Sequence, residues 1–111
     1  MNNEIEIAWI KEIETEEYGI ILAACDKELL GKKLHKGAIE VVISKRFYGG
    51  RLVTLKELKN LMRKADVLNL VGERVVNLAE EMGLIHSDAK IFFEDADGRK
   101  IPHAQMYRFF L

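Results

Sequence analysis

Alternating apolar and polar residues near the start of the chain predict two paired β-strands. Apolar side chains alternate with acidic or small ones over residues 4–9, which is the period of a half-buried strand. Residues 19–25 are almost wholly apolar and predict a more deeply buried strand. Because the acidic run at residues 14–17 supplies a polar turn between these segments, we expect them to pair.

The next stretch predicts a short helical turn and a third strand. Residues 27–30 fit one turn of helix that ends at Gly31, since glycine readily adopts the left-handed conformation at a helix end. Residues 38–44 again alternate, with three β-branched side chains on one face. We therefore expect a strand there.

Two helices are predicted over residues 54–82. Thr54 followed three positions later by Glu57 fits a capping box, and the apolar residues that follow form a single helical stripe. A second helix is expected to begin at Asn69 as its N-cap and to stop at Gly83.

The C-terminal part predicts a hairpin. Residues 90–94 have strand composition, and the Asp-Ala-Asp-Gly sequence at residues 95–98 suits a reversing turn. Because Pro102 has no N–H to donate to a sheet, we expect its arm to be an edge strand or to break before His103.

Together these elements predict one α+β domain spanning residues 1–111. A chain of 111 residues is long enough for one core and too short for two. We expect an antiparallel or mixed sheet of four to five strands, with the two helices packed on one face.

Charge is distributed unevenly along this domain. Residues 27–64 carry eleven lysines and arginines against three glutamates, a local balance of +8 in a chain whose net charge is −1. This predicts an electropositive region that suits an anionic partner, although a solvated rim of cations is the ordinary alternative. The cations that we expect to form it are Lys45, Arg46, Arg51, Lys59 and Arg63.

Cysteine usage and hydropathy favour the cytoplasm. Cys25 is the only cysteine, so the chain cannot form an internal disulfide. The first residues lack the basic start and apolar run of a secretory signal, and the longest apolar run is far shorter than the roughly 20 residues that a membrane span requires. We expect no membrane association.

Residues 45–51 place three cations and two aromatics around Gly49 and Gly50. The cations and the glycine N–H groups could bind phosphate, and an aromatic ring could stack on a base. The spacing, however, matches no nucleotide-binding fingerprint. The alternative is that Phe47 and Tyr48 belong to the core and the glycines form a turn.

Gly72 and Glu73 lie in what the pattern predicts to be the first turn of a helix. A helix start offers unpaired amides to an anion, whereas the structural alternative is that Gly72 admits another backbone at close range. His103 is either a general base or a hydrogen-bonded structural histidine. Cys25, beside Asp26, is either a nucleophile or, more commonly, an inert buried thiol.

Metal and cofactor sites are not expected. The three histidines and Cys25 show no zinc-ligand spacing. The turn at residues 95–98 lacks the later ligands of a calcium loop.

Four phrases together resemble a known family. They are LAACDKELLGK at residues 22–32, FYGG at 47–50, NLVGE at 69–73 and PHAQ at 102–105. In this order they are similar to the archaeal "domain of unknown function 424" family. The resemblance implies a single α+β domain from an archaeon and implies no reaction.

These phrases coincide with the candidate positions above, so we hypothesise that they line one cleft, with Asp26 and Lys32 at its margin. The candidate ligand-binding residues are Tyr48, Gly49, Gly50, Asn69, Gly72, Glu73, His103 and Gln105.

Three functions follow as hypotheses. The first is a non-enzymatic binding module for an RNA or ribonucleoprotein partner, favoured because no nucleophile–base pair is visible. The second is a small enzyme or ligand-binding domain for an anionic metabolite, with Glu73 or His103 as acid or base. The third is a protein–protein adaptor that uses the apolar residues 109–111.

Overall fold

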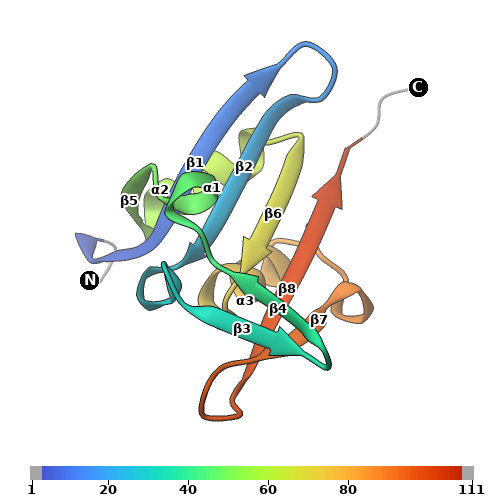
Figure 1. Cartoon of the computed structure of the whole chain (residues 1–111). Coiled ribbons are helices and arrows are strands. Elements are labelled where there is room, and N and C mark those ends of the chain that lie inside the picture. Colours follow the sequence, from blue (N-terminus) through green and yellow to red (C-terminus); the bar gives the residue numbers. More distant parts are fainter. Residues whose placement is uncertain (1–3, 109–111) are drawn as a thin grey trace.

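Eight strands form one mixed sheet in this protein, whose computed structural model describes residues 4–108. The order across the sheet is β4-β3-β7-β8-β6-β2-β1-β5, and the β2–β6 pair is parallel whereas the other pairs are antiparallel (Figure 1). The strands are β1 (Glu6–Thr15), β2 (Gly19–Asp26), β3 (Lys33–Lys36), β4 (Ile39–Val42), β5 (Arg51–Thr54), β6 (Val67–Val71), β7 (Ile91–Glu94) and β8 (Lys100–Tyr107).

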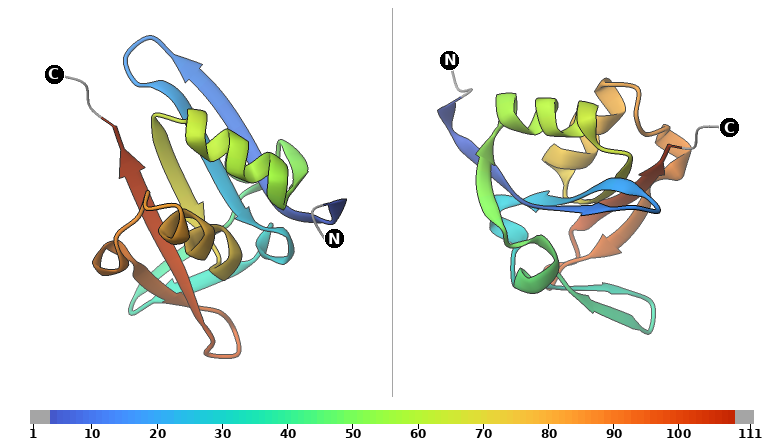
Figure 2. Two further views of the ribbon diagram at one scale, coloured as in Figure 1. Left: turned by 180° about the vertical axis from the view of Figure 1, so that it is seen from behind. Right: turned by 90° about the horizontal axis from the view of Figure 1, so that it is seen from above.

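The helices divide between the two faces of this sheet. They are α1 (Lys45–Tyr48), η2 (Lys27–Leu29), α2 (Leu55–Lys64), α3 (Glu73–Glu81) and η3 (Ser87–Ala89). Figure 2 shows α2 and α3 on one side, which we call the helix face, and α1 with the β3–β4 hairpin on the other, which we call the hairpin face. Among residues 4–108, no helix is long and apolar enough to cross a membrane.

Each face has its own apolar core, because successive side chains of a strand point to opposite sides. Leu22 and Ala24 of β2 belong to the core under α2 and α3. Ala23 and Cys25 belong to a smaller core under α1, η2 and the hairpin. The almost wholly apolar sequence of β2 therefore reflects burial on both faces.

Several sequence predictions are confirmed. The α+β class, the mixed sheet and the β1–β2 pair are present. The α2 helix begins with the predicted capping box, in which the Thr54 side chain accepts from the Glu57 N–H and the Glu57 carboxylate accepts from the Thr54 N–H.

The predicted strand number was too low. Instead of four or five strands the sheet has eight. The strands β3 and β5 are only four residues long and do not show a clear period, and β6 lies where a helix was predicted to begin. The prediction that Asn69 is the N-cap of the second helix was also wrong. Asn69 lies inside β6, and α3 begins at Glu73 after Gly72.

Pro102 neither breaks β8 nor places it at an edge, since β8 pairs with both β6 and β7. The carbonyl of Pro102 accepts from the Gly72 N–H at 2.9 Å. The nitrogen and the carbonyl of a strand residue point to the same neighbouring strand, so the Pro102 nitrogen also faces β6. It lies just beyond the last residue pair of the β6–β8 ladder, which is Val71 with His103. The missing donor therefore falls where the β6 ladder has already ended.

Candidate functional site

The start of α3 is capped by a side chain from β2. Asp26 is only 3% exposed, and its two carboxylate oxygens accept from the N–H groups of Arg74 and Val75, each at 3.0 Å. Gly72, at the N-cap position, has no side chain to do this. Two of the amides that a helix start offers to an external anion therefore already bind a carboxylate of the protein.

Gly72 is shaped to this carboxylate. Its φ of +119° is one that residues with side chains rarely adopt. A Cβ added at Gly72 would lie 2.4 Å from Cγ of Asp26. The close approach inferred from the sequence is thus real, although the neighbour is a side chain rather than a backbone.

Burial sets the electrostatics of Asp26. Removal from water raises the pKa of its carboxyl above 3.8, and the N–H bonds from Arg74 and Val75 oppose this shift without cancelling it.

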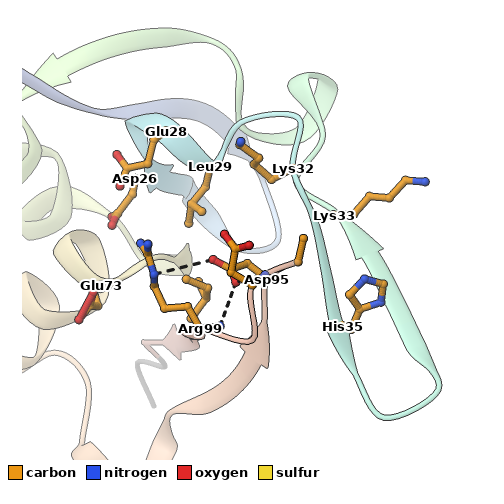
Figure 3. Close-up of a pocket in the computed structure, with 12 residues that line it drawn as sticks. Asp26, Glu28, Leu29, Lys32, Lys33, His35, Glu73, Asp95 and Arg99 are labelled. Carbon is orange, nitrogen blue, oxygen red and sulfur yellow. Dashed lines mark hydrogen bonds and ion pairs between the residues drawn. The ribbon is translucent and has the colours of Figure 1, made fainter.

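A polar pocket opens beside Asp26 between η2, β3 and the β7–β8 turn. Its volume is about 430 Å³. Its lining combines five carboxylates with three cations and one imidazole, from Asp26, Glu28, Glu73, Asp95, Asp97, Lys32, Lys33, Arg99 and His35. Nε of Arg99 lies 3.9 Å from Oδ2 of Asp95. Figure 3 shows this ion pair within the lining. Because charges of both signs line the pocket, it offers no uniform positive field to an anion.

The FYGG segment packs mainly against the protein itself. The Gly49 N–H donates to the Lys45 carbonyl at 2.7 Å, and the Gly50 N–H donates to the Ile10 carbonyl at 3.0 Å. A Cβ at either glycine would lie within 2.6 Å of the same carbonyl oxygens. Both amides are therefore occupied. Gly50 lets the chain between α1 and β5 lie close to β1, whereas Gly49 lies close to Lys45 at the start of α1.

Tyr48 reaches across the hairpin face to β6. Its hydroxyl donates to Oδ1 of Asn69 at 2.7 Å, and burial raises the pKa of Tyr48 above its usual range. Phe47 packs edge-on against this ring, with the ring centroids 4.8 Å apart, and is itself 43% exposed.

Strand register brings half of the predicted cleft residues onto one face. Asn69 pairs with Gln105, and Val71 pairs with His103, so these four side chains point to the hairpin face with Tyr48 above them. Gly72 and Glu73 lie instead at the start of α3. Tyr48, Asn69, His103 and Gln105 therefore share one face, whereas Gly72 and Glu73 do not join them.

An apolar pocket lies between the β3–β4 hairpin and the sheet. Its volume is about 130 Å³, and it is lined by Leu34, Val41, Val42, Ile43, Tyr48, Val71, Phe93 and His103. Glu73 lines the polar pocket and His103 lines this one, so the two alternative candidates for an acid or base lie in different pockets.

The predicted cations are divided between the two faces. Lys45 and Arg46 belong to α1 on the hairpin face, whereas Lys59 and Arg63 belong to α2 on the helix face. Arg51 lies on the edge strand β5, 3.4 Å from the Glu57 carboxylate.

A cation that the sequence reasoning missed is Lys11. Its Nζ donates to the Arg46 carbonyl at 2.7 Å, which brings a third cation to α1. The alternation of β1 continues to Thr15, and following it past Trp9 would have placed Lys11 on this face.

We expect Cys25 to resist thiol reagents in the folded protein. Its side chain is fully buried, and burial together with the neighbouring Asp26 carboxylate raises its pKa from 9.0 to about 12, so little thiolate exists at neutral pH. With DTNB at pH 8, the folded protein should react at less than roughly a tenth of the rate seen in urea. Rapid, complete labelling without urea would contradict this burial.

Two further observations bear on the candidate chemistry. Between residues 4 and 108, no group of three or more His, Cys, Asp and Glu side chains is arranged to hold a metal ion. Residues 109–111, considered as an apolar anchor, lie outside the described part of the chain.

Comparisons with known proteins name a family without an activity. The family described as "Protein of unknown function (DUF424)" matches residues 13–109. A crystal structure of an uncharacterized conserved protein from Methanopyrus kandleri is similar in fold, with a TM-score of 0.66 and 23% sequence identity. The match covers 94% of this chain and 96% of that one. No curated protein matches the chain significantly.

Proposed function

This chain belongs to the DUF424 family, and we propose that it is a non-enzymatic cytoplasmic module that binds single-stranded RNA, free or within a ribonucleoprotein. The binding surface is the part of the hairpin face that α1 and the hairpin leave uncovered, which we call the open surface. In Figure 1 this surface faces the viewer on the upper parts of β1, β2, β6 and β8.

The observation that carries this proposal is how β1 distributes its charges. Lys11 pairs with Ala23 and points to the hairpin face, whereas Glu12 and Glu14 alternate to the helix face. On β2, β6 and β8 the residues that share the Lys11 face, within the described chain, include no carboxylate; they are Ile21, Ala23, Cys25, Val67, Asn69, Val71, Ile101, His103, Gln105 and Tyr107. A chain of net charge −1 thus keeps carboxylates off these strand positions.

The open surface and the α1 helix at its border together offer the three kinds of contact that single-stranded RNA uses. Lys11, Lys45 and Arg46 supply positive charge for phosphates. Phe47 and Tyr107 are 43% and 51% exposed, and stacking on an aromatic ring contributes roughly 1–3 kcal/mol per base. The side-chain amides of Asn69 and Gln105, which lie opposite each other on β6 and β8, can hydrogen-bond to unpaired base edges.

This proposal predicts salt-sensitive RNA binding that depends on α1. Fluorescence anisotropy with a labelled single-stranded RNA of about twelve nucleotides should detect binding at low salt. Replacing Lys45 and Arg46 with glutamine removes two phosphate contacts, so affinity should fall about tenfold and the salt slope by about 1.4.

The matched control exchanges two cations on the helix face. The variant with Lys59→Gln and Arg63→Gln carries the same change in charge and should bind within about twofold of wild type. Equal losses in both double variants would contradict the assignment to the open surface. Undetectable binding of wild type at low salt would overturn the RNA proposal and favour a protein partner for the same surface.

The metabolite hypothesis has less support. It needs Glu73 or His103 beside an anion site, but Glu73 lines a pocket of mixed charge and His103 lines an apolar one.

A further inference from the structure

We propose that the apolar pocket beside the open surface receives one base of the RNA and prefers cytosine. This inference rests on the proposed function, because it assigns specificity to the same RNA. The pocket adjoins the open surface through two residues. His103 lies two positions from Gln105 on the same face of β8, and Tyr48 lines the pocket while bonding to Asn69.

The size of the pocket limits the base to a single ring. Its volume is about 130 Å³. An apolar cavity of about 150 Å³ accommodates benzene, so a pyrimidine fits and the two fused rings of a purine do not. Aliphatic side chains and Phe93 make up the rest of the lining and suit the faces of an aromatic ring.

The hydrogen bonds of the two polar lining residues select among pyrimidines. Nδ1 of His103 lies 2.9 Å from the Leu70 carbonyl oxygen, which can only accept, so Nδ1 is the donor in this hydrogen bond. In the tautomer with hydrogen on Nδ1, Nε2 is an acceptor. The hydroxyl of Tyr48 uses its hydrogen in the hydrogen bond to Oδ1 of Asn69, so towards a ligand the Tyr48 oxygen is also an acceptor. Both polar side chains therefore require donors from the ligand.

Cytosine meets this requirement better than uracil. The exocyclic amino group of cytosine offers two hydrogens. Uracil offers one N–H between two carbonyl oxygens, and those oxygens would face the acceptors of the pocket without a hydrogen between them. A site that hydrogen-bonds a donor discriminates against an analogue that lacks it.

The test compares oligocytidylate, oligouridylate and oligoadenylate of equal length by fluorescence anisotropy. Wild type should bind oligocytidylate about tenfold more tightly than either of the others. In His103→Asn, the amide can still donate to Leu70 but Nε2 is gone, so the cytosine preference should fall below about twofold while oligouridylate affinity stays nearly constant. His86→Ala, which changes an exposed histidine after α3, should keep the full preference.

The outcomes separate this inference from the proposed function. If no oligonucleotide binds, the proposed function fails and the inference fails with it. If all three bind equally to wild type, only the base pocket is refuted. A His103→Asn variant that weakens all three oligonucleotides equally would also refute it, because the imidazole would then act without reading the base. Thermal unfolding of each variant establishes that it is folded at the assay temperature.

Discussion

Replacing Gly72 with alanine should destabilise the protein by about 3–5 kcal/mol. A non-glycine residue held at positive φ outside its preferred region costs on the order of 1–3 kcal/mol. The new Cβ would in addition lie 2.4 Å from Cγ of buried Asp26 and would push the carboxylate off the N–H groups of Arg74 and Val75. Urea unfolding followed by far-UV circular dichroism measures the change.

Gly98→Ala separates these two contributions. Gly98 has a φ of +80°, and a Cβ there would meet nothing within 4 Å. It should therefore cost only about 1–2 kcal/mol of backbone strain. If both alanine variants lost the same free energy of unfolding, the contact between the new Cβ and Asp26 would make no measurable contribution to the destabilisation of Gly72→Ala.

Removing the Asp26 carboxylate should cost about 2–4 kcal/mol of unfolding free energy in Asp26→Ala. The variant leaves two N–H groups at the start of α3 without their acceptor, and the Val75 side of this contact is buried. Asp66→Ala is the matched control, because Asp66 accepts from one backbone N–H, that of Ile20 at 2.9 Å, and should cost less.

The same carboxylate should give a defined pH dependence. Because burial raises the pKa of Asp26 above 3.8, the folded state binds its proton more tightly than the unfolded state does. The unfolding free energy should therefore decrease as pH rises from about 4 through the raised pKa, and then level off. Asp26→Asn has no such proton, so the difference between wild type and this variant isolates the effect. A difference that grows in favour of wild type with rising pH would contradict the direction of the shift.

The parts of the fold that were predictable are those determined by neighbouring residues. The α2 helix is recognisable because its cap, Thr54 with Glu57, lies within one turn of its own sequence. The β1–β2 pair is recognisable because its alternation and its turn are continuous in the chain.

The start of α3 was not predictable in this way. Its cap comes from Asp26, 48 positions before Arg74, and no local pattern relates the two. Asparagine is a common residue type at N-caps, but Asn69 lies in β6, where its side chain accepts a hydrogen bond from the Tyr48 hydroxyl. Tertiary pairing therefore overrode the local preference.

The candidate site was predictable as a set of positions but not as an arrangement. The sequence phrases identified Tyr48, Asn69, His103 and Gln105, and register then placed them on one face. Charge counted along residues 27–64 could not distinguish the cations of α1 from those of α2, because the chain passes from one face of the sheet to the other between them.

The origin of the Asp26 cap implies an order of assembly during folding. The α2 helix carries its cap within its own segment, so it can be capped before any strand has paired. The α3 helix acquires its cap only when β2 and β6 lie side by side, because that pairing brings Asp26 to the amides of Arg74 and Val75. We therefore expect closure of the long loop between the two parallel strands, which contains α2, to come before consolidation of α3.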